Sequence, residues 1–368
     1  MAQGVVRKYA LAGKSDVRGA SASNRSVVML LGMTGILIAV FLLKLVAGSV
    51  SIPLSDVVAV LHGGTASKVS WQTIILDFRL PQALTAILAG AALGVSGLLM
   101  QTLFRNPLAD PFILGISSGA SLGVALVVLA VGTVTTTFLT GLSFLGDLSV
   151  ATAASLGAGI VMIIVLTAAR RIANGMTLLI LGLLFSYMTG SIVSLLLYFS
   201  IPERIQAYIS WTFGSYSGVT WDQLAIMLPI IALGLVAAFV MSKPLNILLL
   251  GEEYAWSMGV NITQLRIVII LATSLLAGTV TAFCGPIGFI GIAVPHLCRN
   301  LFNTADHRLL IPATILTGAV MSVIASLIAS LPGSNIVLPI NAITAFIGAP
   351  TVIWVILHRR NIEANVTS

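Results

Sequence analysis

The chain has 368 residues, of which 58% are hydrophobic and only 8% are charged, and its mean hydropathy is +1.09. Soluble domains carry about 25% charged residues because their surfaces must be hydrated, so this composition excludes a soluble enzyme. The high apolar content also excludes a disordered chain. A net charge of +7 could suggest nucleic-acid binding, but the basic residues flank apolar stretches and form no stripe. We therefore expect an integral membrane protein that binds no nucleic acid.

The apolar residues are grouped in runs of helical length. A membrane-spanning helix needs about 20 apolar residues, and the runs are continuous, unlike the alternating segments of a β-barrel. The eighth run is short and is broken by Gly288, Gly291 and Pro295. We expect an all-α membrane protein with ten transmembrane helices, near residues 27–48, 80–103, 112–131, 149–168, 176–199, 221–241, 265–283, 287–301, 308–330 and 338–357.

The basic residues predict the orientation of these helices, because cytoplasmic loops carry an excess of Lys and Arg. With a cytoplasmic N-terminus, the outer loops carry only Lys68, Arg79 and Arg204, and Lys44 lies within the first span. Both chain ends are then cytoplasmic. The inner segments carry Arg7, Lys8, Lys14, Arg18, Arg25, Arg105, Arg170, Arg171, Lys243, Arg266, Arg299, Arg308, Arg359 and Arg360.

The same pattern divides the chain into three parts. We expect a cytoplasmic polar tail at 1–26, a ten-span membrane domain at 27–358 and a short cytoplasmic tail at 359–368. The polar N-terminus has no evident cleavable signal peptide, so the first span is expected to be retained.

The span order allows an inverted repeat of five plus five helices, as in many transporters. A weak echo between Ala89-Gly90 with Gly97 and Ala277-Gly278 with Gly285 fits this interpretation. Gly and Ala are also common in membrane helices for packing reasons, so both explanations stay open.

No catalytic, metal-binding or cofactor-binding pattern is expected in this chain. Cys284 and Cys298 form no C-x-x-C motif and accompany no histidine cluster. The only Gly-Lys-Ser, at 13–15, lacks the first glycine of a P-loop, which would fall at Lys8. Apart from Lys44 near an edge, no ionisable residue lies at the centre of a span, which disfavours an ion-coupled secondary transporter. Any nucleotide hydrolysis is therefore expected on a partner.

Residues 246–261 (NILLLGEEYAWSMGVN) are too polar to span a bilayer. Gly251 interrupts the preceding run, Glu252 and Glu253 suit a helix N-terminus, and Gly259 is placed to cap the other end. The pattern predicts a short cytoplasmic helix on which Ala255 and Met258 share one face. It is either an ordinary interfacial helix or a docking helix for a partner.

Two other segments have alternative interpretations. Residues 105–111 (RNPLADP) predict a rigid turn in which Asn106 and Asp110 satisfy free backbone donors, either as a connector or as part of a gate. Ser186, Gly190 and Ser194 recur every four residues on the fifth span and either line a pathway or form a packing face. Ala86, Gly90 and Gly94 on the second span favour close helix packing.

Five stretches together resemble the FecCD-type permeases, the membrane subunits of ABC importers for ferric siderophores, haem and cobalamin. In order along the chain they are RLPQALTAILAGAALGVSGLLMQTLFRNPLADPFILGISSGAS (79–121), WTFGSYSGVTWDQL (211–224), GEEYAWSMGVN (251–261), GPIGFIGIAVPHLCR (285–299) and TAFIGAP (344–350).

This resemblance implies a type II ABC importer permease in the plasma (inner) membrane of a prokaryote. It implies a homodimer or close heterodimer with the pathway at its interface, two cytoplasmic ATPase subunits that bind ATP and Mg, and an extracytoplasmic substrate-binding protein. The cargo would be an iron(III)-siderophore-type chelate, or alternatively cobalamin, haem or an oxyanion such as molybdate. This chain itself would bind no cofactor.

The resemblance also assigns roles to individual residues. Arg79 matches a basic outer position that meets carboxylates of the binding protein, and Asn106 and Leu108 match a cytoplasmic gate. The 251–261 stretch looks like the coupling helices that seat in the ATPase, with Gly251, Glu252, Glu253, Ala255, Met258 and Gly259 as coupling residues.

The sequence departs from the family pattern at a few positions. Gln82 replaces an expected second outer arginine, Val337 replaces an acidic residue that often precedes Pro339, and Asn341 stands where glycine is common. The segment between spans 4 and 5 reads Asn174-Gly175-Met176, where small hydroxyl residues are frequent.

Overall fold

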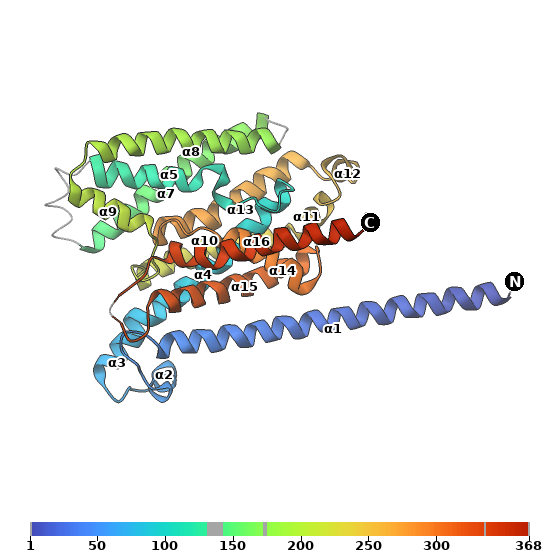
Figure 1. The fold of residues 1–368 in the computed structure, drawn as a ribbon, viewed down its shortest axis with the longest axis horizontal. Coiled ribbons are helices and arrows are strands. Elements are labelled where there is room, and N and C mark those ends of the chain that lie inside the picture. The colour runs from blue at the N-terminus through green and yellow to red at the C-terminus, as the bar shows by residue number, and fades with distance from the viewer. Residues whose placement is uncertain (1, 131–142, 172–174, 335, 367–368) are drawn as a thin grey trace.

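The computed structural model describes residues 2–130, 143–171, 175–334 and 336–366. Every regular element in these ranges is a helix (Figure 1). The elements are α1 (Ala2–Val46), α2 (Leu54–Leu61), α3 (Val69–Thr73), the π-helix η1 (Ile74–Arg79), α4 (Leu80–Leu103), the 3₁₀ helix η2 (Pro111–Leu114), α5 (Ile116–Ala125), the π-helix η3 (Leu126–Ala130), α7 (Ser143–Arg171), α8 (Gly175–Tyr198), α9 (Pro202–Thr212), α10 (Trp221–Val240), α11 (Ser242–Leu248), α12 (Glu252–Ser257), α13 (Ile262–Cys284), α14 (Ile290–Phe302), α15 (His307–Ala329) and α16 (Ile340–Val366).

Seven helices in the described part of the chain are long and apolar enough to cross a membrane. Each of the ten predicted runs overlaps a helix, but three do not meet this length and hydropathy criterion. Apolar helices at Ile116–Leu129 and Ile340–Ile353 are shorter. Helix α14 has 13 residues, or about 20 Å at 1.5 Å per residue, against a hydrocarbon layer of about 30 Å. The expectation that the eighth run is short is therefore confirmed, and a count of ten transmembrane helices stays a prediction.

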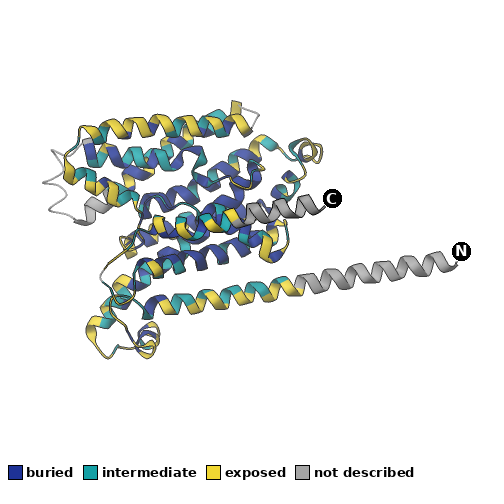
Figure 2. Cartoon of the chain, in the orientation of Figure 1, coloured by how far each residue is buried: buried dark blue, intermediate teal, exposed yellow. Residues whose placement is uncertain are grey.

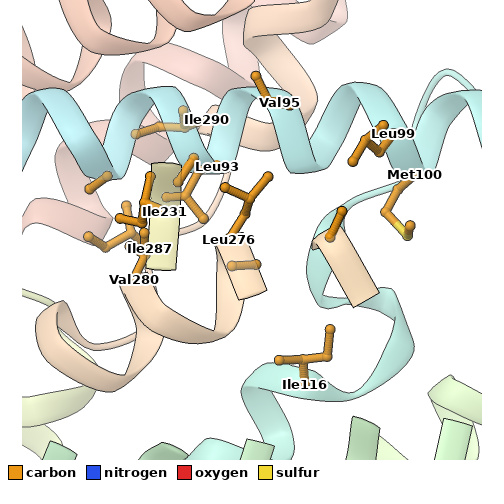
Figure 3. Packing of buried hydrophobic residues seen from close by; sticks show 14 of the residues in the cluster. Leu93, Val95, Leu99, Met100, Ile116, Ile231, Leu276, Val280, Ile287 and Ile290 are labelled. Carbon is orange, nitrogen blue, oxygen red and sulfur yellow. The ribbon is translucent and has the colours of Figure 1, made fainter. Parts of the chain in front are cut away.

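Helix α4 forms the centre of the bundle. It is apolar around its whole circumference, and almost every residue from Ala89 to Leu103 is buried, as expected of a helix enclosed by other helices. It packs against α15, α14, α13 and α10. Its side chains meet those of α13 and of the loop before α14, for example Leu93 near Leu276 and Ile287 (Figure 3).

Glycines set the spacing between α4 and its neighbours. A Cβ atom built on Gly90 would lie 2.1 Å from the carbonyl oxygen of Gly318 on α15. One built on Gly97 would lie 1.9 Å from the carbonyl oxygen of Gly291 on α14. Helices therefore touch backbone to backbone here, the arrangement that small residues permit in membranes. This confirms the predicted packing role of Gly90.

Helices α1 and α8 lie at the periphery and present exposed side chains (Figure 2). Helix α1 is joined to α15 near its C-terminal end, where Lys44 Nζ donates to the carbonyl of Ser326 at 3.1 Å and to Ser330 Oγ at 2.5 Å. Lys44 is only 2% exposed. The cation in the first span is thus satisfied by neutral oxygens on α15.

The two ends of the bundle carry different elements. Helices α2, α3 and α9 lie at one end, and α12 lies at the other (Figure 1). The N-terminal end of α1 and the C-terminal end of α16 point toward the α12 end (Figure 1). Both chain ends and residues 246–261 were predicted to lie on the same side of the membrane, and they lie at the same end of the bundle; that this side is cytoplasmic stays a prediction.

Candidate functional site

The turn that follows α4, which we call the gate turn (residues 105–110), is built by its polar side chains. The backbone reverses at Arg105, which has φ of 46°. Asn106 Oδ1 then accepts the Leu108 N–H at 2.9 Å, and Asp110 Oδ1 accepts the Phe112 N–H at 2.8 Å. These bonds confirm that Asn106 and Asp110 satisfy free backbone donors.

The gate turn is fixed to α14 and also faces solvent. His296 Nε2 lies 2.7 Å from the Pro107 carbonyl oxygen, and because a carbonyl only accepts, this ring nitrogen donates. Leu108 is 44% exposed. Burial raises the pKa of Asp110 to about 6, while its bond from the Phe112 N–H acts in the opposite direction. The raised pKa means that the folded chain binds this proton more tightly, so the contribution to stability is lost as pH rises through about 6.

Helix α12 is a single short helix with both ends fixed by glycine. Gly251 precedes it with φ of 125° and ψ of 149°, a conformation that only glycine adopts readily. At the other end Gly259 has φ of 83°. The Gly259 N–H donates to Trp256 O at 2.9 Å and the Val260 N–H to Ala255 O at 3.0 Å. These two bonds form a Schellman motif, which confirms the predicted cap at Gly259.

An ion pair anchors α12 to the bundle. Arg266 Nη2 on α13 lies 3.2 Å from Glu252 Oε1. Arg266 is 4% exposed and Glu252 41% exposed, so the carboxylate reaches from the surface to a buried cation. The orientation of α12 is therefore fixed relative to α13.

The exposed side of α12 is aromatic. Ala255 is fully buried, whereas Tyr254 is 51%, Trp256 75% and Met258 55% exposed. The prediction that Ala255 and Met258 share a face is wrong, because Met258 already lies beyond the last helical residue and its backbone has left the helix. Leu249 and Leu250 before the helix are 41% and 65% exposed, and we call these exposed residues on and around α12 the α12 patch (Leu249, Leu250, Tyr254, Trp256 and Met258).

An open pocket of about 640 Å³ brings the gate turn and α12 together. A Cβ built on Gly251 would lie 3.5 Å from Arg105 Nη2, so the two segments are in contact. The pocket thus brings together three segments that are far apart in the sequence, at 103–106, 176–179 and 250–254. The pocket is lined by Leu103, Phe104, Arg105, Asn106, Met176, Leu179, Leu250, Gly251, Glu252, Glu253 and Tyr254.

Comparisons with known proteins identify the class of protein that has this arrangement. The model of the FecCD transport family matches residues 36–358. The chain belongs to the FecCD transport family. The chain is 35% identical over 337 residues to the Vitamin B12 import system permease protein BtuC of Klebsiella pneumoniae, covering 91% of this chain and 95% of the relative. It is 36% identical to the Hemin transport system permease protein HmuU of Yersinia pestis, covering 78% and 84%.

A solved structure supports the same assignment. An inward-facing metal-chelate type ABC transporter superposes with a TM-score of 0.77 at 29% identity, covering 90% of this chain and 99% of that chain. The chain is thus a multi-pass membrane permease of a bacterial ABC importer, a transport protein and not an enzyme. The resemblance on which the sequence prediction depended is confirmed.

Arg79 lies differently from what was expected of this FecCD-family chain. The side chain was predicted to be an exposed docking cation, but it is only 7% exposed. Its guanidinium donates to the carbonyl oxygen of Leu45 at 2.6 Å, to that of Val46 at 2.9 Å and to that of Val50. The predicted exposure is wrong because the last two residues of α1 and the loop that follows supply acceptors that enclose the cation. A contact with a binding protein stays a prediction and would require this loop to open.

Of the three predicted pathway residues, Gly190 and Ser194 are exposed in the described chain, whereas Ser186 is partly buried beside Gly115. Ser186 Oγ donates to Gly182 O at 3.0 Å and Ser194 Oγ to Gly190 O at 2.9 Å, both within α8. A Cβ built on Gly190 would meet no atom within 4 Å. Gly190 therefore packs against no other part of the described chain, and the part of the face at Gly190 and Ser194 is open to a partner chain or to a pathway.

The departures from the family pattern have partial structural explanations. Asn341 Oδ1 accepts the Gly288 N–H at 3.1 Å and so links the start of α16 to the loop before α14. Gln82 Nε2 donates to Ser217 Oγ at 3.2 Å. Val337 is 64% exposed. Met176 lines the pocket beside the gate turn, whereas Asn174 lies outside the described residues.

The sequence analysis missed the aromatic residues of the α12 patch. Tyr254 and Trp256 stand in the same polar segment as the predicted coupling residues, and large aromatics in a segment rich in charge are a signal of a contact surface. The cap positions of a short helix do not by themselves determine which of its side chains are exposed.

Proposed function

We propose that this permease forms the translocation pathway for a metal chelate of the iron(III)-siderophore type, driven by a separate ATPase subunit that docks on the α12 patch. The observation that carries the proposal is the pocket in which the gate turn and α12 meet. Movement of a partner on α12 would reach the gate turn directly, as in gating by rigid-body motion. The solved transporter that the chain resembles is of metal-chelate type, which supports this cargo class.

The assembly that we propose has ten membrane segments in each chain. The seven long helices together with α5, α14 and α16 would supply them, as two inverted halves. Two copies would face each other across the pathway, with Ser186, Gly190 and Ser194 lining it through a weakly polar surface. A substrate-binding protein would deliver cargo from outside, and ATP and Mg would bind to the ATPase subunits.

Cobalamin and haem are the alternative cargoes. The names of two relatives, a vitamin B12 permease and a hemin permease, favour them. An oxyanion such as molybdate is a further alternative in the same family. The choice depends on the binding protein as much as on the permease.

Uptake by a reconstituted complex tests the proposed function. We expect proteoliposomes that contain the permease and its ATPase to accumulate a ferric siderophore only when ATP and the loaded binding protein are both present. Parallel assays with cobalamin and haem identify the cargo, and uptake of one of these instead would replace the siderophore. Uptake by the permease alone under an ion gradient would contradict the ABC mechanism.

A cysteine at position 108 tests the gate. In a symmetric dimer, residues near the axis face their own counterparts, so we expect Leu108→Cys to crosslink across the dimer in one nucleotide state and to stop uptake. Leu301→Cys is the matched control because Leu301 is similarly exposed, at 47% against 44%, but lies on α14. A Leu108→Cys variant that forms no crosslink in any nucleotide state would show that this turn is only a connector.

A further inference from the structure

A series of hydrogen bonds joins α12 to the helix that carries the gate turn. Helix α11 leads directly into α12, and the Gly251 N–H donates back to Leu248 O at 3.1 Å. Asn246 on α11 donates through Nδ2 to Asp306 Oδ1 at 2.5 Å. Asn246 Oδ1 accepts the His307 backbone N–H at 2.8 Å and lies 2.7 Å from His307 Nδ1. One amide thus connects α11 to the start of α15.

The donors and acceptors between Asn246, Asp306 and His307 Nδ1 are fixed by chemistry, whereas the Thr102 hydroxyl has a single hydrogen and lies 2.8 Å from both Leu98 O and His307 Nε2. The Asp306 carboxylate only accepts, so the Asn246 amide must direct its NH₂ group there and its oxygen toward His307. His307 Nδ1 therefore donates. On the opposite side of the ring, His307 Nε2 lies 2.8 Å from Thr102 Oγ1 on α4. Thr102 and His307 are 2% and 1% exposed, so water does not compete for these bonds.

Thr102 stands one helical turn before the gate turn, which is held separately by α14. Arg299 Nη1 donates to Gln101 Oε1 at 2.7 Å, and His296 donates to the Pro107 carbonyl. The end of α4 is therefore tied to α14 on one side and to α15 and α11 on the other. The second connection leads through α11 to α12.

The space behind the gate turn is not filled. A pocket of about 280 Å³ is lined by Thr102, Arg105, Pro107, Leu249 and His307, among others. Close-packed interiors transmit displacement through direct contact, and that contact is incomplete here. The hydrogen bonds through His307 therefore form a second connection between α12 and the end of α4, beside the contact of Gly251 with Arg105.

We propose that Asn246, His307 and Thr102 form a relay that positions the gate turn according to the movement of α12. The relay depends on the proposed function, because it requires an ATPase that moves α12. These are positioning residues, and none of them lies in the α12 patch or among the predicted gate residues. Replacing these residues should uncouple ATP hydrolysis from transport. The ATPase docking surface and the gate turn would both stay intact.

The experiment measures cargo transported per ATP hydrolysed by the reconstituted complex, using whichever cargo the wild-type complex accumulates. Asn246→Asp places a second carboxylate against Asp306, and we expect the ratio to fall about five-fold or more, the lower range of allosteric coupling. Adding Asp306→Asn restores the pairing with donor and acceptor exchanged, so the double variant should regain the wild-type ratio. Because the readout is the ratio of transport to hydrolysis, a loss of folded complex alone would lower both rates and leave the ratio unchanged.

Thr102→Val tests the other end of the relay. Its matched control is Thr281→Val, since Thr281 is also buried but bonds only to Ala277 O of its own helix. We expect Thr102→Val to lower the ratio and Thr281→Val to leave it unchanged. Equal ratios for wild type, Asn246→Asp and Thr102→Val would overturn the relay, as would a folded double variant that stays uncoupled. A wild-type complex without ATP-driven transport would instead overturn the proposed function.

Discussion

Replacing Gly97 with alanine should destabilise the whole helical bundle. The new Cβ would lie 1.9 Å from Gly291 O and 2.6 Å from Gly291 Cα, both backbone atoms. No side chain can move aside, so α4 and α14 would have to separate. Overpacking that side chains can relieve costs about 1–3 kcal/mol, and we expect a loss at or above the upper end of this range. Since α14 also holds the gate turn through His296, uptake should be lost too.

The melting temperature of the purified permease in detergent measures this effect. Gly32→Ala on α1 is the control, because a Cβ there would meet no atom within 4 Å. Alanine is favoured over glycine in helices by about 0.5–1 kcal/mol, so the control should melt at the wild-type temperature or slightly above it. A Gly97→Ala variant with wild-type melting temperature would show that α4 and α14 do not approach as closely as described.

The positions of the helices could be predicted because hydropathy depends on composition alone. The same property explains why the short eighth run does not coincide with α14. The apolar run at 287–301 includes the loop residues before Ile290, where Phe289 adopts a positive φ of 68°. Hydropathy does not distinguish an apolar loop from an apolar helix, so the run was longer than the helix that it contains.

The cap and turn residues of the candidate site could also be predicted from the sequence. Gly251, Gly259 and Asn106 act within a few residues of their own positions, and the structure places all three as cap or turn residues. Arg79 was different, because its acceptors lie 29 to 34 residues earlier in the chain. The basic-residue rule locates a charge at the end of a span but gives no information about what encloses it.

The relay residues could not be predicted from the sequence, because their hydrogen-bond partners also lie far away along the chain. His307 meets Asn246 and Thr102 across separations of 61 and 205 residues. Each is an ordinary polar residue at the end of an apolar helix. Their connection appears only when α4, α11 and α15 are packed together.

The largest effect on assembly is expected from Trp256→Ala in the α12 patch. Trp256 is 75% exposed in the single chain, and exposed tryptophans at the centre of a contact surface are the commonest hot spots. Its helix is held by Gly251, by the Schellman motif at Gly259 and by the Glu252–Arg266 ion pair, so little ordering entropy is lost on docking. Removing a hot spot costs about 2 kcal/mol or more, so we expect ATPase affinity to fall about 30-fold.

Titration of the ATPase subunit against permease in nanodiscs measures that affinity. Trp221→Ala is the control, since Trp221 is also exposed, at 43%, but lies at the start of α10 beside η1, where its Nε1 donates to Leu76 O at 3.0 Å. The control should bind the ATPase like wild type, because η1 is predicted to be extracytoplasmic. Equal losses for the two variants would indicate a general packing defect. Wild-type affinity for Trp256→Ala would place the docking surface elsewhere than on α12.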